Sequence, residues 1–232
     1  MGEPEDAGEL RPSGYVGRLQ EFGYGLASPL YDLFVLWAAL PIGGERKLRR
    51  DIASWLEARA GDEVLSLCCG TGATDRALLD LMPNTRITGI DLGRAQLWQA
   101  RRKDATGRIA YRIANAADTG LDSETFDRIM LVGALHEMPR SLRGEILAEA
   151  RRLIRHDGNL LVFEPCRTET RKSAFLRALA LFLWVPGNPE TKTMRDLLKR
   201  GLDTEVREAG FEPLRRHRTS PDWFEAILAR PA

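Results

Sequence analysis

Two glycines mark the first stretch of this chain that could do chemistry. Gly70 and Gly72 follow the apolar run Val64, Leu65 and Leu67, and a helical pattern of apolar residues begins directly after them. The apolar run predicts a buried strand, so the glycines fall where a strand gives way to a helix. Glycine lets the backbone approach a ligand closely, and a helix N-terminus presents free N–H groups. The sequence therefore predicts a seat for an anion or a nucleoside at this turn.

An acid ends the second predicted strand. The segment Arg86–Asp91 has the pattern of a strand, and its final carboxylate lies about twenty residues beyond the glycine turn, the spacing typical of an acid that binds ribose hydroxyls. The alternative is that Asp91 caps the helix expected to begin at Gly93. Glycines followed by such an acid fit two classes of protein, a dinucleotide oxidoreductase and an S-adenosylmethionine-dependent methyltransferase.

Five segments then follow one another in a telling order. They are VLSLCCGTG, GIDLGRAQL, RIANAAD, FDRIMLVGALHEMP and GNLLVFEP. This series resembles the ordered motifs of the class I S-adenosylmethionine-dependent methyltransferases, and the resemblance covers the chain from about Asp51 to its C-terminus. The CCGTG segment and the stretch before it are similar to the quinone C-methyltransferase and phospholipid N-methyltransferase groups.

The resemblance implies S-adenosylmethionine as cofactor and no metal. It assigns cofactor contacts to eight residues near the ends of the first three strands: Ser66, Cys68, Gly70, Gly72, Asp91, Leu92, Ala117 and Asp118. Asp91 would hold the ribose, Leu92 would pack on the adenine, and Asp118 would accept a hydrogen bond from the exocyclic amine. The alternative for Asp118 is a solvated acid in a turn.

The chain departs from the family pattern at two of these positions. Ser66 stands where the family has an acid that helps to bind the cofactor's amino group, and Asp75 is the residue that could compensate. Cys68 stands where many members have glycine. Because no second ligand pair lies at zinc spacing, we interpret Cys68 and Cys69 as small packing residues.

The fourth and fifth predicted strands end in candidate catalytic and substrate-binding residues. His136 and Glu137 follow the fourth strand, where the acceptor's reacting atom should lie, and His136 is a candidate proton acceptor near neutral pH. The alternative is a loop histidine that only packs against the cofactor. Glu164 is a candidate substrate contact or a structural acid. Neither the asparagine-proline-proline motif of amino-group methylases nor a proline-cysteine pair is found here, which disfavours nucleic-acid bases as substrates.

Composition narrows the class of protein further. The chain has 232 residues, 44% hydrophobic and 29% charged, with a net charge of +1. These values favour one globular domain that no strong field draws onto nucleic acid. Three cysteines and the lack of a secretion signal favour a reducing, cytoplasmic location. No apolar run approaches the ~20 residues that a membrane span needs.

The predicted architecture is an α/β fold of Rossmann-like type. Helices and strands alternate, which predicts a mostly parallel seven-stranded sheet with helices on both faces and a C-terminal antiparallel hairpin. The strands are expected at 63–67, 86–91, 108–113, 126–132, 159–163, 211–218 and 223–228, and the helices at 45–59, from 73, at 93–103, 141–156 and 191–209. We expect Gly61 to cap the first of these helices and Gly158 to end the 141–156 helix.

Two further segments accompany the methyltransferase domain, which we assign to residues 45–232. Residues 1–14 are polar and predict a mobile tail, and residues 15–44 predict a helical lid whose Tyr24 and Tyr31 contact the substrate. The alternative for the lid is a helix packed on the core. Residues 171–190 form an apolar insertion: it is either a helix buried under the lid, or a surface for an apolar substrate or a peripheral membrane contact.

These features favour a methyltransferase that acts on a small apolar or amphipathic acceptor, such as a quinone precursor or a lipid. A protein that kept the fold but only binds S-adenosylmethionine is the second hypothesis, motivated by Ser66. A nucleotide-linked oxidoreductase is the third. The sequence gives no indication of oligomeric state.

Overall fold

One seven-stranded sheet forms the centre of the described chain. The computed structural model describes residues 43–169 and 190–232. In the sheet the strands follow the order β3-β2-β1-β4-β5-β7-β6. Their bounds are β1 (Glu63–Leu67), β2 (Arg86–Asp91), β3 (Ala110–Ile113), β4 (Phe126–Val132), β5 (Ile154–Pro165), β6 (Phe211–Arg218) and β7 (Phe224–Pro231). The predicted tail, nearly all of the predicted lid and nearly all of the 171–190 insertion lie outside the described residues, and their predictions stay predictions.

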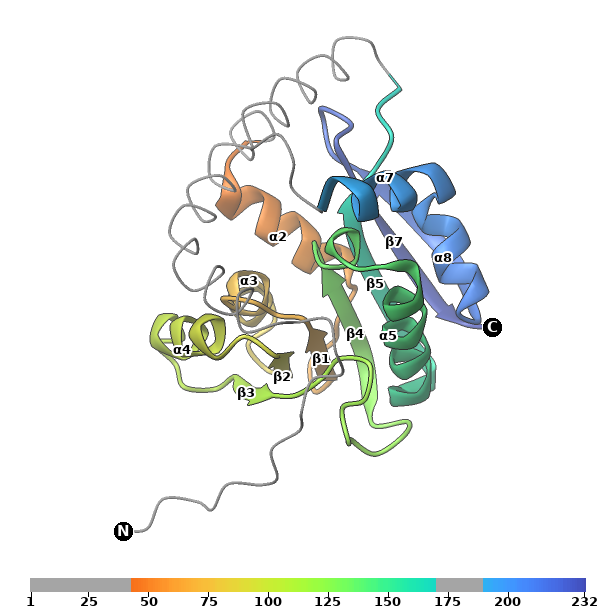
Figure 1. Cartoon of the computed structure of the whole chain (residues 1–232). Coiled ribbons are helices and arrows are strands. Elements are labelled where there is room, and N and C mark those ends of the chain that lie inside the picture. The colour runs from red at the N-terminus through yellow and green to blue at the C-terminus, as the bar shows by residue number, and fades with distance from the viewer. Residues whose placement is uncertain (1–42, 170–189) are drawn as a thin grey trace.

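The strand directions decide where a ligand can bind. β2 and β4 both run parallel to β1, and β5 runs parallel to β4, whereas β7 is antiparallel to β5 and β6 (Figure 1). The carboxyl ends of β2, β1, β4 and β5 therefore meet at one edge of the sheet. In open α/β sheets, ligands bind at this edge, where the strand order reverses.

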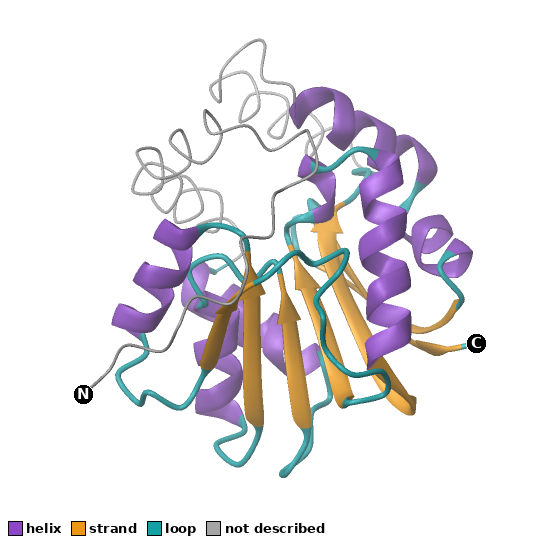
Figure 2. Cartoon of the chain, turned by 60° about the horizontal axis from the view of Figure 1, so that its bottom comes forward, coloured by secondary structure: helices purple, strands orange, loops and turns teal. Residues whose placement is uncertain are grey.

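Helices cover both faces of the sheet (Figure 2). They are α2 (Glu45–Trp55), α3 (Ala73–Leu81), α4 (Arg94–Lys103), the short 3-10 helix η2 (Leu135–Glu137), α5 (Arg140–Leu153), α7 (Glu190–Arg200) and α8 (Leu202–Glu208). Apolar residues of α2, α3 and α4 pack with one face of the sheet in one core, and those of α5, α7 and α8 pack with the other face in a second core. Alternating strand residues feed the two cores: Val64 enters the first, and Leu65 and Leu67 enter the second.

The predicted fold class is confirmed, and several predicted bounds are wrong. The first predicted helix ends at Trp55 rather than at residue 59, and the chain turns through Glu57 at φ 54°, so Gly61 does not cap it. The third strand starts two residues later than predicted, at Ala110. The last strand covers Phe224–Pro231 instead of 223–228.

Two larger errors concern glycines. α5 ends at Leu153 and β5 begins at once, so Gly158 lies inside a strand instead of ending a helix. A Cβ at Gly158 would lie 2.8 Å from the carbonyl oxygen of Asp127, so glycine allows the two backbones to approach closely there. The predicted 191–209 helix is two helices, because Gly201 at φ 84° interrupts the helical backbone between α7 and α8.

Candidate active site

The loop after β1 turns through three left-handed residues. Cys68 has φ 54°, Gly70 φ 54° and Gly72 φ 67°. The loop is tied to β2, because Cys69 N–H donates to the carbonyl of Ile90 at 2.9 Å. A side chain rarely adopts this conformation. The geometry explains why glycine suits position 68 in the family, and it makes Cys68 a strained substitute.

The two glycines of the loop serve different purposes. A Cβ at Gly72 would collide with the ring and hydroxyl of Tyr111 on β3, so Gly72 is needed for packing. Nothing lies within 4 Å of a Cβ built at Gly70, so this glycine faces open space. A ligand can therefore lie directly against the backbone at Gly70.

Asp91 holds the loop from the end of β2. Its Oδ2 accepts a hydrogen bond from Gly70 N–H and its Oδ1 accepts one from Gly93 N–H, both at 2.8 Å. Gly93 is the N-cap residue of α4, and no side chain forms a capping hydrogen bond there. The predicted alternative, in which Asp91 caps this helix, is therefore limited to the hydrogen bond from Gly93 N–H to Asp91. Burial raises the pKa of Asp91 and the backbone N–H groups of Gly93, Gly70 and Leu92 oppose the rise. A carboxylate has about four acceptor sites, so Asp91 retains acceptor capacity for a ribose hydroxyl.

Cys68 lies at the centre of the predicted site. Burial raises the pKa of its thiol, and the charges of Asp91, Glu137 and Glu164 raise it further. The ends of β2, β4 and β5 therefore all act on this one side chain. A thiol whose pKa is raised in this way stays protonated at neutral pH, so Cys68 is a packing residue and a poor nucleophile.

A buried carboxyl stands behind Ser66. Ser66 is 4% exposed and Asp75, in the first turn of α3, is 1% exposed. Burial raises the pKa of Asp75 to about 6, and the hydroxyl of Ser66 and the charge of Arg76 oppose the rise. Tyr111 is also close enough to lower this pKa, yet neither its Oη nor Asp75 Oδ2 has a well-formed hydrogen bond. Ser66, which stands where the resemblance implies an acid, thus has the carboxyl of Asp75 beside it.

The loop after β3 is held from α5 by a residue that the sequence did not reveal. Ala117 N–H donates to the side-chain oxygen of Asn115 at 3.1 Å, and Asp118 is exposed. Glu149 accepts from the N–H of Thr119 at 3.0 Å and from its hydroxyl at 2.6 Å. The guanidinium of Arg152 brings the pKa of Glu149 down to about 2. Glu149 therefore fixes the loop that presents the predicted adenine contacts, although in the sequence it is only a polar residue among the charges of a helix.

Glu164 orients His136. Its Oε1 accepts hydrogen bonds from the N–H groups of Ala134 and Leu135 at 2.8 and 2.7 Å, and its Oε2 lies 2.7 Å from His136 Nδ1. Glu164 is fully buried, and these bonds show that it positions the histidine loop. Because a carboxylate accepts hydrogen bonds, we assign the ring proton to Nδ1, which leaves Nε2 as the basic nitrogen. Nε2 lies 4.0 Å from Glu137 Oε1.

The same loop is anchored on its other side by Arg143. This arginine of α5 is fully buried, and its Nη1 donates to the carbonyl of Met138 at 3.0 Å. It also bonds Glu205 of α8 and Asp196 of α7. The second anchor could not be predicted from the sequence, because nothing in it pairs an arginine with acids more than fifty residues away.

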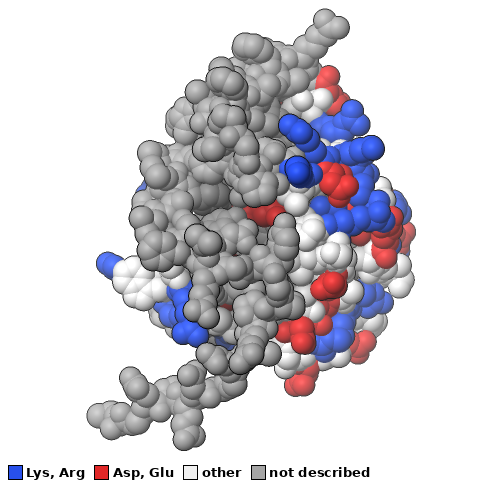
Figure 3. Space-filling model, viewed as in Figure 1, with Lys and Arg blue, Asp and Glu red and all other residues white. Residues whose placement is uncertain are grey.

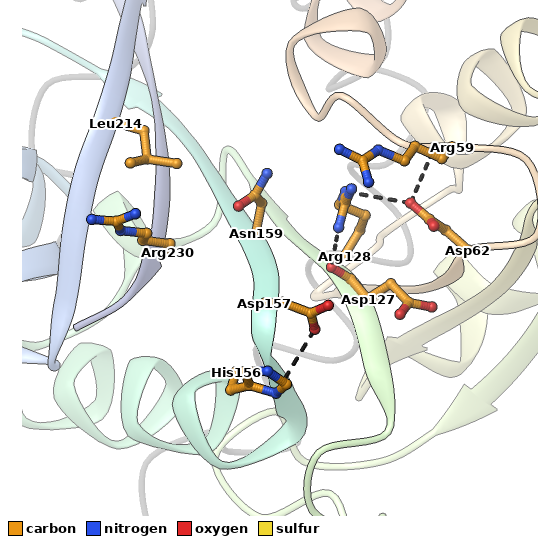
Figure 4. Close-up of a pocket in the computed structure, with 9 residues that line it drawn as sticks. All are labelled: Arg59, Asp62, Asp127, Arg128, His156, Asp157, Asn159, Leu214 and Arg230. Atoms are coloured by element: carbon orange, nitrogen blue, oxygen red, sulfur yellow. Dashed lines mark hydrogen bonds and ion pairs between the residues drawn. The ribbon is translucent and has the colours of Figure 1, made fainter.

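A cavity of about 410 Å³ lies at the other end of the parallel strands, by the start of β4 and the first half of β5 (Figure 4). It is lined by Arg59, Asp62, Asp127, Arg128, His156, Asp157, Asn159, Leu214 and Arg230. Figure 4 shows Arg128 between Asp62 and the backbone of Asp127, with Arg59 close by. None of the predicted site residues lines it.

Some predictions cannot be placed. Tyr24 and Tyr31 lie outside the described residues. Over the described ranges no group of histidine, cysteine, aspartate and glutamate could hold a metal ion. In the same ranges no helix combines the length and the hydropathy needed to cross a membrane.

The described residues fit an adenosyl cofactor: an open backbone at Gly70, a carboxylate with spare acceptor capacity at Asp91, and a second buried acid at Asp75. Fold and residues together define an α/β protein whose sheet has room and partners for such a cofactor at the carboxyl ends of its parallel strands. Residues 64–158 match the family model described as a methyltransferase domain.

Two curated relatives extend the match. A ubiquinone/menaquinone biosynthesis C-methyltransferase of Paracoccus denitrificans is 28% identical over 146 residues, which is 61% of this chain and 58% of the relative. An uncharacterized methyltransferase of Synechocystis is 27% identical over 201 residues, 87% of this chain and 91% of the relative. The chain thus spans little more than half the length of the first of these proteins.

Solved structures share the fold at lower identity. Human N-acetylserotonin methyltransferase, in complex with its cofactor, superposes with a TM-score of 0.57 at 18% identity, covering 79% of this chain and 51% of that one. The [4+2]-cyclase SpnF superposes with a TM-score of 0.65 at 16% identity, covering 91% of this chain and 95% of that one. The family model, the two relatives and the shared fold support a class I S-adenosylmethionine-dependent methyltransferase over a nucleotide-linked oxidoreductase.

Proposed function

We propose that this chain transfers the methyl group of S-adenosylmethionine to a small apolar or amphipathic acceptor, of which a quinone precursor is the best-supported kind. The single observation that carries the proposal is the meeting of two elements at one edge of the sheet: the glycine loop held by Asp91, and the His136–Glu164 pair. The quinone C-methyltransferase relative supports the acceptor class. A cytoplasmic location goes with this proposal.

When bound, the cofactor supplies a methyl group already attached to a good leaving group. The protein's task is then to align nucleophile, methyl and sulfur and to exclude water. Gly70 gives the cofactor a bare backbone to lie on, and Asp91 accepts from the ribose hydroxyls while it keeps the loop in place. Leu92, Ala117 and Asp118 surround the adenine in this proposal.

Asp75 takes over the charge that Ser66 lacks. Its Oδ2 is buried without a well-formed hydrogen bond, and Ser66 is the strand residue nearest in role to the family's acid. We assign the pair Ser66–Asp75 to the ammonium group of the cofactor's amino-acid part. Asp75→Asn should then weaken binding of S-adenosylhomocysteine about tenfold, the effect of a charge-assisted hydrogen bond. Methylthioadenosine lacks the ammonium and should bind both proteins equally. Equal loss for both ligands would contradict the assignment.

His136 acts as the proton acceptor in this proposal. Glu164 keeps the proton of the ring on Nδ1, so Nε2 can take the proton that the acceptor loses when its carbon or heteroatom is methylated. Glu137 lies beside Nε2 and stabilises the imidazolium that forms. Glu164 positions the ring without touching the substrate.

Calorimetry and turnover test the proposal together. S-adenosylmethionine and S-adenosylhomocysteine should bind with a stoichiometry of one and NAD should not bind. Methyl transfer from radiolabelled cofactor should then be found on a panel of hydroquinones and phenols. NAD binding, or no binding of either adenosyl compound, would overturn the proposal.

A second candidate function is supported by one relative in fold. SpnF carries this fold and is a [4+2]-cyclase, so the fold alone does not require methyl transfer. Together with Ser66, this keeps a protein that binds the cofactor without consuming it as the alternative. Tight binding with no labelled product on any acceptor of the panel would favour this alternative.

A further inference from the structure

Positive charge is concentrated at one edge of the sheet. Residues 92–113, which form α4 and β3, contain six arginines and lysines and one acid, a net charge of +5 against +1 for the whole chain. The cations are Arg94, Arg101, Arg102, Lys103, Arg108 and Arg112. The rest of the chain is therefore acidic on balance.

The one acid in the segment does not neutralise its five arginines. Asp104 is 8% exposed, and its carboxylate accepts hydrogen bonds within its own loop, from the N–H groups of Thr106 and Ile109, both at 3.0 Å. Arg101 donates to the carbonyl of Tyr111 at 2.8 Å and Arg108 donates to the carbonyl of Pro83. These bonds fix the two guanidinium groups and leave their charge in place.

None of the five arginines of this edge forms an ion pair with a described residue. At the opposite edge of the sheet, in contrast, Arg215 pairs with Glu57, and Arg230 pairs with Glu212 at 2.7 Å. Figure 3 agrees: blue side chains lie beside an exposed white one at the left margin, over α4, whereas blue and red mix on the right.

Large apolar side chains are exposed within the same edge. Trp98 is 56% exposed and Ile113 is 45% exposed, two of the three large exposed hydrophobic residues of the described chain. Arg94, Trp98 and Arg102 follow one another at intervals of four, so they form one stripe on the outer face of α4. The guanidinium of Arg102 lies 4.6 Å from the centre of the Trp98 ring.

We propose that this α4–β3 edge docks on the surface of an anionic lipid bilayer. A short basic helix with an exposed tryptophan suits the headgroup region, where the ring can enter the acyl boundary and the cations stay with the lipid phosphates. Nucleic acid is the competing polyanion. An exposed aliphatic residue such as Ile113 gains nothing from phosphate, and it gains from contact with acyl chains.

The α4–β3 edge lies close to the predicted cofactor site. Ile113 is the register partner of Asp91, so the apolar end of β3 lies beside the predicted ribose carboxylate. A protein docked through α4 and β3 keeps the carboxyl ends of its parallel strands, and hence the predicted cofactor site, near the lipid. The docking itself stands without the methyl-transfer proposal, because it depends only on charge and exposure.

Vesicle flotation tests the docking without any turnover. The full chain should float with vesicles of phosphatidylcholine mixed with phosphatidylglycerol and should stay behind with phosphatidylcholine alone. Since each cation near an anionic surface contributes about 1 kcal/mol, Arg94→Gln with Arg102→Gln should weaken binding about 10- to 30-fold. Trp98→Gln should weaken it by a smaller factor, and added salt should weaken binding of the unaltered chain.

The matched control removes two cations from the opposite edge. Arg215→Gln with Arg230→Gln changes the net charge equally and should leave flotation unaltered. Circular dichroism and melting temperature establish that each variant folds, and single substitutions replace any pair that does not. Equal loss in the control, full retention in the Arg94 and Arg102 variant, or binding to duplex or single-stranded RNA without flotation would each overturn the proposal.

Discussion

The two ends of the same parallel strands treat charge in opposite ways. At the amino ends, Arg128 Nε lies 3.4 Å from Asp62, and Arg155 lies 2.5 Å from Asp127. At the carboxyl ends, Asp91 and Glu164 are held by backbone N–H groups, and neither forms an ion pair with a lysine or arginine of the described chain. At one end the carboxylates are paired with arginines, and at the other they are held mainly by backbone N–H groups.

This difference shows how a fold can bury carboxylates and still leave a negative electrostatic potential that attracts a ligand. Backbone N–H groups satisfy a carboxylate through dipoles, which lower the cost of burial and add no net charge. The carboxyl edge therefore stays attractive to a cation, and S-adenosylmethionine carries both a sulfonium and an ammonium. Ion pairs at the amino edge attract no such ligand, although a cavity lies there.

The largest effect should come from the histidine at the carboxyl edge. His136→Ala removes the proposed base and should lower kcat by about 10²- to 10⁴-fold, the usual contribution of general base catalysis, with the cofactor Kd unchanged. Glu164→Gln keeps the shape of the side chain, removes the charge that orients Nδ1, and should shift the pH profile of kcat as well as lower it.

Both variants need a fold check and a positional control. Glu137→Gln changes a neighbouring acid and should have the smaller effect, since Glu137 lies 4.0 Å from Nε2. If His136→Ala turns over at the original rate, catalysis rests on alignment alone and His136 is a packing residue.

The next effect concerns Asp75 and stability. A folded pKa of about 6, raised chiefly by burial, means that the native protein binds a proton more tightly than the unfolded chain does. The free energy of unfolding therefore falls as pH rises from about 4 to 6 and stays lowered above that range. Asp75→Asn removes this cost, so at pH 7.5 the variant should be more stable by up to about 3 kcal/mol. Below pH 4 the gain should disappear.

Urea unfolding at several pH values measures this gain. Asp80→Asn is the matched control, because Asp80 lies on the same helix and is exposed. Equal stability of the Asp75 variant and the unaltered chain at pH 7.5 would mean that the buried carboxyl carries no such cost.

Asp91 comes third. Asp91→Asn leaves one amide N–H₂ facing the N–H of Gly70 or Gly93, and it removes a charge from the ribose site. Cofactor binding should weaken by about 1–3 kcal/mol, which raises the Kd roughly 5- to 150-fold. Calorimetry measures it, and Asp118→Asn should cost less because Asp118 is exposed. An unchanged Kd for the Asp91 variant would remove the ribose role.

Sequence reasoning located this carboxyl edge because its signals are local. β1, β2 and β4 start and end where the apolar runs predicted, and Asp91 closes β2 as expected. Apolar periodicity and glycine punctuation are properties of neighbouring residues. The alternation of helices and strands then predicted a mostly parallel sheet, since parallel strands need crossover connections that are usually helical.

What the sequence could not predict is made by distant partners. Glu149 holds Thr119 across thirty positions, and Arg143 reaches Glu205 across sixty-two. The bounds failed for a related reason: helix propensity continues through Ile154, but pairing of Ile154 with Phe126 on β4 draws it into the sheet. Tertiary contacts of this kind override local preference.

The smallest expected effect is that of Asp62→Asn, which tests the ion pairs at the amino ends of the parallel strands. Asp62 accepts from Arg59 N–H at 2.8 Å and lies 3.4 Å from Arg128 Nε, with 13% of its side chain exposed. In Asp62→Asn, Arg128 keeps its bonds to the carbonyls of Glu57 and Asp127, so the free energy of unfolding should fall by about 1 kcal/mol.

The same variant should leave the carboxyl end untouched. Distant sites that share no partner act independently, so the cofactor Kd and kcat of Asp62→Asn should match those of the unaltered chain. Calorimetry and urea unfolding on one preparation measure both ends at once. A change in Kd of more than about threefold would mean that the strands transmit charge from one end to the other. The paired and unpaired edges would then have to be treated as one electrostatic unit.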